Sequence, residues 1–187
     1  DISSFSQLTS DKRVEHILER AEYYGYSGDR VKGLIFCSTK KEASELSKKF
    51  NETGRYSTIM LCGENSQEER ESAVERLVTT NHPHKLDYIF TVDIFNEGVD
   101  IPEINQVIML RPTESPIIFV QQLGRGLRKA DGKEFVIVID FIGNYQNNYM
   151  IPIALSGDRT GNKDNIRRSL MEGNNLIQGA STIYFDE

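Results

Sequence analysis

Two arginines and two glycines lie within one short stretch of the sequence, QQLGRGLR at residues 121–128. Arg125 and Arg128 are three residues apart, so on a helix both side chains project from the same face. Their forked donors match pairs of phosphate oxygens, and Gly124 and Gly126 allow a phosphate to approach the backbone closely. A plain helix end, closed by glycine and with arginines at the negative end of the dipole, explains this stretch equally well.

A second polar stretch, TVDIFNEGVDIP at residues 91–102, carries three carboxylates. Asp93, Glu97 and Asp100 lack the alternating spacing of a calcium-binding loop, which argues against a metal site. A carboxylate at the end of a strand can instead accept a hydrogen bond from a ribose hydroxyl. The stretch therefore favours a nucleotide contact.

Apolar runs alternate with amphipathic segments along most of the chain. We expect strands at 33–38, 56–62, 86–92, 105–110 and 134–140, and helices at 10–24, 39–54, 66–80 and 115–128. This alternation predicts an α/β fold with a mostly parallel central sheet covered by helices on both faces. Ligands of such sheets bind beyond the carboxyl ends of the strands, so the polar segments that follow the strands are expected to share one edge.

The composition is that of an ordinary globular protein, with 38% hydrophobic and 27% charged residues in 187. A net charge of -6 argues against a protein that coats itself with nucleic acid, although it allows a local basic groove. There is no apolar run long enough for a membrane span and no signal-peptide pattern, so we expect a cytoplasmic fragment of a longer chain. Cys37 and Cys62 are too few and too far apart for a disulfide framework or a zinc knuckle, and are expected to be buried free thiols.

Three stretches in this order and spacing, GLIFCST, TVDIFNEGVDIP and QQLGRGLR, resemble motifs IV, V and VI of the second RecA-like domain of superfamily-two helicases, which include the DEAD- and DEAH-box proteins. The resemblance covers about residues 30–145. Finer features, such as EGVDIP and GKEFVIVIDFIGN, are most similar to the type III restriction-subunit branch and its DNA helicase relatives. The resemblance implies a RecA-like three-layer sandwich at 31–155, after a helical lead-in at 1–30 and before a linker and short appendage at 156–187.

The resemblance also implies roles for residues around a nucleotide. Arg128 matches the arginine finger that reaches the γ-phosphate of ATP, and Arg125 matches a second phosphate contact. Gln121 corresponds to a polar residue at the ATP cleft. Gly98 and Asp100 match positions near the nucleotide, with the aspartate contacting the ribose.

Further matched positions concern nucleic acid. Thr91 corresponds to a motif V threonine that touches the nucleic-acid backbone, and Ser38 and Thr39 fall at the end of motif IV beside the same track. Arg70 stands where relatives have an arginine after the second strand, and we assign it no role.

The sequence contains no GxxxxGK[ST] loop and no internal DExD or DExH motif. The resemblance therefore implies that ATP and Mg²⁺ are bound mainly by a preceding RecA-like domain of the same chain, and that this chain alone does not hydrolyse ATP. We expect the second motor domain of an ATP-dependent helicase or translocase, acting on nucleic acid with DNA preferred. The alternative is a catalytically silent RecA-like docking module in a restriction or repair complex.

Two other groups of side chains have competing interpretations. His82 and His84 suggest a metal pair, but a turn without a third ligand favours a solvated loop. Tyr23, Tyr24 and Tyr26 suit stacking on bases, whereas tyrosines at a helix end more often pack against the neighbouring sheet. We expect packing.

Overall fold

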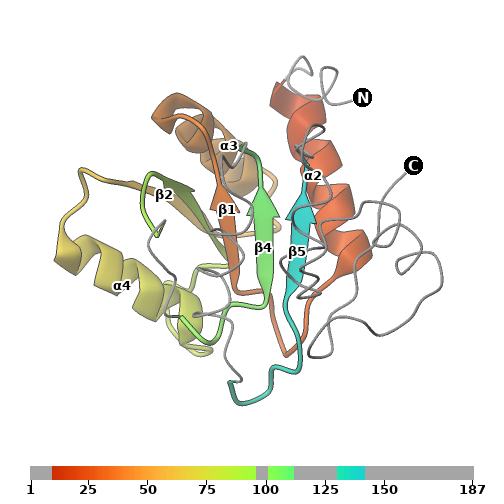
Figure 1. Cartoon of the computed structure of the whole chain (residues 1–187), viewed down its shortest axis with the longest axis vertical. Helices are drawn as coiled ribbons and strands as arrows, with labels where there is room; N and C mark the ends of the chain where they lie inside the picture. The colour runs from red at the N-terminus through yellow and green to blue at the C-terminus, as the bar shows by residue number, and fades with distance from the viewer. Residues whose placement is uncertain (1–9, 96–100, 112–129, 142–187) are drawn as a thin grey trace, which may run out of the picture.

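The computed structural model describes residues 10–95, 101–111 and 130–141. In these residues five strands form one sheet, in the order β2-β3-β1-β4-β5, and every neighbouring pair is parallel (Figure 1). The strands are β1 (Gly33–Phe36), β2 (Thr58–Cys62), β3 (Tyr88–Val92), β4 (Gln106–Met109) and β5 (Ile137–Asp140). The predicted α/β class with a parallel central sheet is confirmed.

The described helices are α2 (Ser10–Tyr24), α3 (Lys40–Glu52) and α4 (Gln67–Val78). Ser66 and Glu69 form a capping box at the start of α4, in which the side chain of each bonds the backbone of the other. The helix predicted at 115–128 and everything predicted after residue 141 lie outside the described residues.

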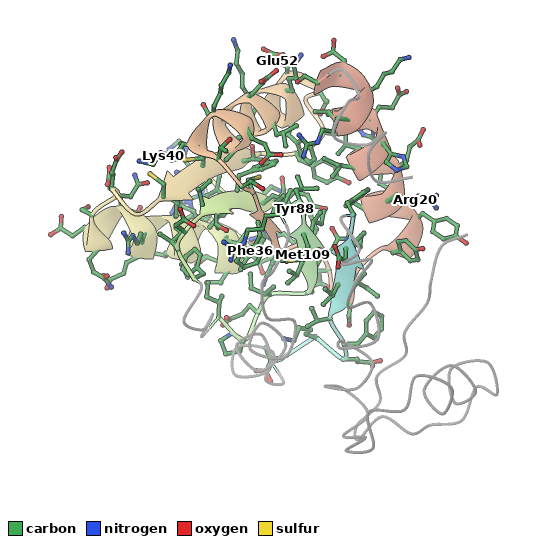
Figure 2. The ribbon with its side chains drawn as sticks, turned by 45° about the horizontal axis from the view of Figure 1, so that its top comes forward. Arg20, Phe36, Lys40, Glu52, Tyr88 and Met109 are labelled. Atoms are coloured by element: carbon green, nitrogen blue, oxygen red, sulfur yellow. The ribbon has the colours of Figure 1, made fainter. Side chains whose placement is uncertain are left out.

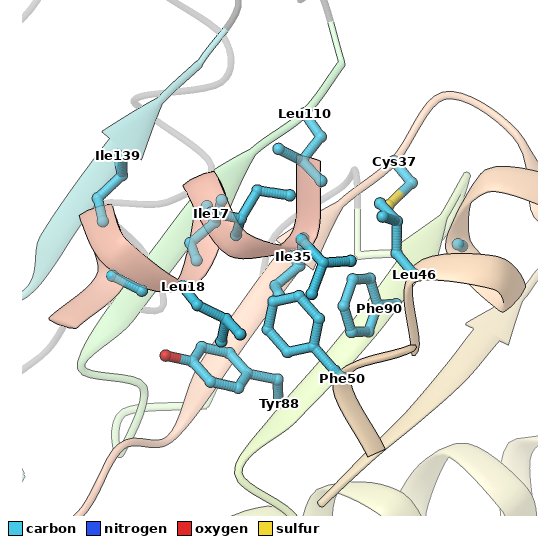
Figure 3. Close-up of a cluster of buried hydrophobic side chains, with 14 of the residues drawn as sticks. Ile17, Leu18, Ile35, Cys37, Leu46, Phe50, Tyr88, Phe90, Leu110 and Ile139 are labelled. Atoms are coloured by element: carbon cyan, nitrogen blue, oxygen red, sulfur yellow. The ribbon is translucent and has the colours of Figure 1, made fainter. Parts of the chain in front are cut away.

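The helices cover both faces of the sheet, which gives three layers. On one face, side chains of α2 and α3 pack against β1, β3 and β4 (Figure 3). Phe50 of α3 lies at the centre of this face, with its ring edge-to-face with those of Tyr88 and Phe90. On the other face, α4 contributes Ala73 and Leu77 to a second core.

Helix α2 belongs to the segment assigned from sequence to a lead-in at 1–30, yet it shares its core with the sheet. Val14, Ile17, Leu18 and Ala21 are buried in the same cluster as β1 and β3. Ion pairs also join α2 to α3 and to the residues after it; they are Arg13–Glu42, Lys49–Asp11 and Arg55–Glu22. The described part of the lead-in is thus one layer of the sandwich, while the boundaries at 30 and 155 stay predictions.

The last strand is shorter than predicted, because β5 begins at Ile137 rather than at residue 134. The backbone N–H of Glu134 donates to the hydroxyl of Ser27 at 2.9 Å, so it does not take part in a strand ladder. The neighbouring Lys133 is buried and donates to the carbonyl of Ile104 at 3.1 Å. Glu134, which the apolar pattern assigned to the start of the strand, is thus bonded to Ser27 instead.

A buried polar network fixes the end of α2 to the amino edge of the sheet. Gln106 accepts from the Tyr88 hydroxyl at 2.6 Å and donates to the carbonyls of Ala21 at 2.9 Å and Gly25 at 2.7 Å. The Tyr88 ring lies against Gly33, where a Cβ would be 2.2 Å from a ring carbon, so only glycine fits. Contacts within the domain therefore occupy this part of the amino edge of the sheet.

The stability of the fold is expected to fall at alkaline pH, because one tyrosine is buried in the core and another is partly buried against it. Burial is the largest cause raising the pKa of Tyr88, and burial followed by the charge of Glu22 raises the pKa of Tyr56 to about 12. An unfolded tyrosine titrates near pH 10, so the folded chain holds these protons more tightly. Their stabilisation is complete below about pH 10. That of Tyr56 is lost as the pH rises through about 12, and that of Tyr88 falls over the same range and beyond it, at up to about 1.4 kcal/mol per pH unit for the buried Tyr88.

Denaturant unfolding at pH 9 and pH 11 tests this expectation. The loss of unfolding free energy between the two values should be smaller in Tyr88→Phe than in the wild type. Tyr23→Phe is the control, since that side chain is 77% exposed and should leave the loss unchanged. An equal loss in Tyr88→Phe and wild type would show that Tyr88 does not carry the effect.

Candidate functional site

The carboxyl ends of the central strands lie level with one another. Phe36 of β1 is in register with Thr91 of β3 on one side and with Met109 of β4 on the other. The ladder continues one step further, since the N–H of Leu110 donates to the carbonyl of Phe36 at 2.8 Å. The described segments that follow β1, β3 and β4 therefore leave the sheet at one edge, as predicted.

Ser38 and Thr39 lie exposed at this edge, where β1 passes into α3. Thr39 is the N-cap of α3 and accepts from the N–H of Glu42 at 3.2 Å, while the Glu42 carboxylate accepts from the N–H of Ser38 at 2.8 Å. These contacts satisfy backbone donors of the first turn. The Ser38 side chain stands at the positive end of a 13-residue helix and faces solvent.

Lys40 adds a cation beside these two residues. Its ammonium lies 2.5 Å from the Glu64 carboxylate, in the turn after β2. This hydrogen bond is the main cause that raises the pKa of Lys40 and lowers the pKa of Glu64. The edge thus carries both signs of charge.

Thr91 is placed differently from Ser38 and Thr39. It lies in β3, between β2 and β1, and its side chain is fully buried, with no hydrogen-bond partner for its hydroxyl among the described residues. Its carbonyl accepts from the N–H of Cys37 at 2.9 Å, so it adjoins Ser38 through the backbone alone. The structure does not bring the three residues onto one surface, and the contact of Thr91 with nucleic acid stays a prediction.

Asp93 and Arg111 form an ion pair that the sequence did not indicate. The Arg111 Nη1 lies 3.6 Å from the Asp93 Oδ1, and the Arg111 guanidinium carbon is 5.8 Å from the centre of the Phe36 ring. The sequence presents Asp93 only as one of three carboxylates after a strand, and none of the three motifs includes Arg111. The pairing depends on the register of three strands, which spacing along the chain does not show.

Arg70 supports the turn between β2 and α4. Its Nη2 donates to the carbonyl of Gly63 at 2.8 Å.

Cys37 and Cys62 are buried free thiols, as predicted. Burial raises the pKa of Cys37, so its thiol stays protonated at neutral pH and is no nucleophile.

The histidine and tyrosine predictions have different outcomes. The N–H of His84 donates to His82 Nδ1 at 3.0 Å in the loop before β3, and the described part of the chain contains no group of three metal-ligating side chains. Tyr24 packs against the core, but packing is wrong for Tyr23 and Tyr26, which are 77% and 42% exposed. Position 24 continues the buried stripe of α2 at helical spacing, whereas position 23 lies off it and the helix has ended before 26.

The predicted nucleotide residues, Gly98, Asp100, Gln121, Arg125 and Arg128, lie outside the described residues. Phe95 and Arg111 are the last described residues before the segments that carry them. Across the described ranges, no helix is both long and apolar enough to cross a membrane.

Comparison with known proteins identifies a family. The model of the helicase conserved C-terminal domain matches residues 12–130. The putative ATP-dependent helicase IRC3 of Saccharomyces cerevisiae is 27% identical over 143 residues, which are 76% of this chain and 20% of that protein. The type I restriction enzyme EcoKI endonuclease subunit of Escherichia coli is 29% identical over 119 residues, 59% of this chain and 10% of that subunit. The chain thus spans a fifth or less of the length of these two relatives.

A solved structure with the same fold is the Escherichia coli DEAD-box protein SrmB in complex with regulator of ribonuclease activity A. It superposes with a TM-score of 0.54 at 18% identity, over 73% of this chain and 80% of that one. The family match covers more than half of the chain and includes most of α2 and the strands β1 to β4, whereas β5 follows it. The chain therefore belongs to the helicase conserved C-terminal domain family, as the C-terminal RecA-like domain of a superfamily-two helicase.

Proposed function

We propose that this chain is the second motor domain of an ATP-dependent helicase or translocase that moves along nucleic acid. The observation that carries the proposal is the family match over residues 12–130, on a parallel sheet whose β1, β3 and β4 end at one level. The segment after β3 leads to Gly98 and Asp100, and the segment after β4 leads to Gln121, Arg125 and Arg128. Both candidate nucleotide segments therefore start from the same edge.

In this proposal ATP is shared between two domains. A preceding RecA-like domain holds the triphosphate and Mg²⁺, since this sequence contains no GxxxxGK[ST] loop and no internal DExD or DExH motif. This chain supplies Arg128 as the arginine finger, with Arg125 as a second phosphate contact, Gln121 at the cleft and Asp100 at the ribose. A guanidinium stabilises charge that develops on the transferring phosphoryl group, so this chain alone is expected to be inactive.

Nucleic acid lies, in this proposal, along the carboxyl edge near Ser38 and Thr39. The positive end of α3 favours phosphate there, and the exposed Ser38 side chain can contact it. Contacts to phosphates carry little sequence information, which suits a motor that moves along its track. We propose DNA as that track from the similarity to type III restriction subunits.

Adding a negative charge at Ser38 tests this placement. Ser38→Asp is expected to weaken binding of single-stranded DNA about tenfold, because a carboxylate repels phosphate, whereas folding should be unaffected because an acidic residue suits a helix N-terminus. Ser44→Asp adds the same charge at an exposed position further along α3 and should bind as the wild type does. The measurement is fluorescence anisotropy with labelled oligonucleotides and a longer protein that includes the preceding domain. Equal affinity of the two variants would place the track elsewhere.

A catalytically silent docking module is the second candidate. Exposed large apolar side chains favour it, since such residues are suited to protein contacts; they are Tyr23, Tyr26, Phe135 and Val138. The two functions differ in what Arg128 does. Removal of the Arg128 side chain would not impair the function of a docking module.

A further inference from the structure

Asp93 and Arg111 lie on either side of β1 at the carboxyl edge. Thr91, Phe36 and Met109 are level on β3, β1 and β4, and Asp93 and Arg111 each follow two residues later. Two strand spacings, about 9.6 Å, separate β3 from β4, so only a long side chain can connect their ends.

The Arg111 side chain makes this connection across Phe36. Figure 2 shows Phe36 next to Met109 in the middle of the sheet. The guanidinium of Arg111 lies over the Phe36 ring at 5.8 Å and reaches Asp93 at 3.6 Å. The Arg111 side chain is 21% exposed, whereas that of Asp93 is 77% exposed. The arginine is therefore held along the apolar ring, and the aspartate meets it from the solvent side.

The backbone on the Asp93 side has an unusual conformation. Asp93 and Phe95 have φ values of 54° and 60°, in the left-handed region that residues other than glycine seldom adopt. Such a turn persists when its surroundings favour it. Phe95 packs against the core on the α4 face, and the Asp93 carboxylate is held by Arg111. The turn after β3 is thus fastened at both of its left-handed residues.

We propose that Arg111 is a positioning residue of the motor reaction. Through Asp93 it fixes the turn that leads to Gly98 and Asp100 relative to the end of β4, from which the chain leads to Gln121, Arg125 and Arg128. This inference rests on the proposed function. The Asp93 carboxylate is largely exposed, so its pairing with Arg111 contributes little to stability, and the loss of the pair is expected to lower the rate of the reaction rather than the stability of the fold.

Kinetics of a longer protein that includes the preceding domain test the proposal. Arg111→Met keeps the length of the side chain but removes its charge, and kcat for ATP should fall about tenfold, with KM for ATP and the unfolding midpoint nearly unchanged. Arg111→Lys should recover part of kcat. Asp93→Asn should lower kcat to a similar degree, and the double variant should be no worse than either single variant. Arg55→Met is the matched control, because Arg55 makes an exposed ion pair with Glu22 away from this edge.

Backbone order in the 187-residue chain gives a second, independent measurement. NMR order parameters of the amides of Asp93, Ile94 and Phe95 should fall from values of a rigid backbone, about 0.85, towards 0.6 in Arg111→Met and stay unchanged in Arg55→Met. Unchanged order in Arg111→Met would overturn the proposal, as would reduced order with wild-type kcat, or additive losses in the double variant. If the wild-type longer protein turns over no ATP, the proposed function fails, and the order parameters still decide whether Arg111 fixes the turn.

Discussion

Replacing Arg128 with alanine is expected to lower ATP turnover at least about a thousandfold in a protein that contains this chain and the proposed preceding P-loop domain. In the proposed function the Arg128 guanidinium stabilises the charge on the phosphoryl group during transfer, and alanine would leave that charge unbalanced. Turnover at saturating ATP measures the effect, and circular dichroism of the variant should match that of the wild type.

Two companion variants make this result specific. Arg128→Lys keeps the charge but loses the forked donors, and should restore only a small part of the turnover. Arg55→Ala removes an arginine from an exposed ion pair with Glu22 and should leave turnover unchanged. Wild-type turnover in Arg128→Ala would favour the docking module. Loss of folding would instead indicate that Arg128 holds the structure together.

Truncating Phe50 to alanine is expected to cost about 3–5 kcal/mol of unfolding free energy. Phe50 is fully buried at the centre of the face covered by α2 and α3, where its ring meets those of Tyr88 and Phe90 at centroid distances of 6.0 and 5.1 Å. Alanine would leave a cavity that close packing on both sides keeps from collapsing.

Chemical denaturation of the 187-residue chain measures this loss. Phe135→Ala removes the same atoms from a side chain that is 48% exposed, and its cost should stay within about 0.5 kcal/mol. Similar costs for the two variants would mean that Phe50 does not sit in the core. A large loss for Phe50 alone would show that α3 and the sheet share one cooperative unit.

The elements that the sequence predicted well are those with strong periodicity. The apolar run GLIFCS gave β1, and the stripe Val14, Ile17, Leu18 and Ala21 gave α2 together with its buried face. The capping box of Ser66 and Glu69 was also predictable, because both partners lie within one helical turn. Such signals come from residues that are close together in the sequence, so they can be recognised without knowledge of the fold.

What the sequence did not indicate depends on contacts between distant segments. The burial of Thr91 follows from its place between two other strands, and the pairing of Asp93 with Arg111 follows from the register of β3, β1 and β4. The strand β5 begins later than predicted because the N–H of Glu134 donates to the hydroxyl of Ser27, which lies more than a hundred residues earlier. The spacing of residues along the chain does not predict any of these contacts.

The decisive measurement is ATP hydrolysis by a longer protein that joins this chain to its preceding P-loop domain, compared with the P-loop domain alone, each with and without single-stranded DNA or RNA. We expect turnover by the joined protein that a nucleic acid stimulates, and little turnover by the P-loop domain alone, because the proposed function assigns the arginine finger to this chain. Equal turnover by the two proteins, or no response to either nucleic acid, would contradict the assignment of this chain as the second motor domain.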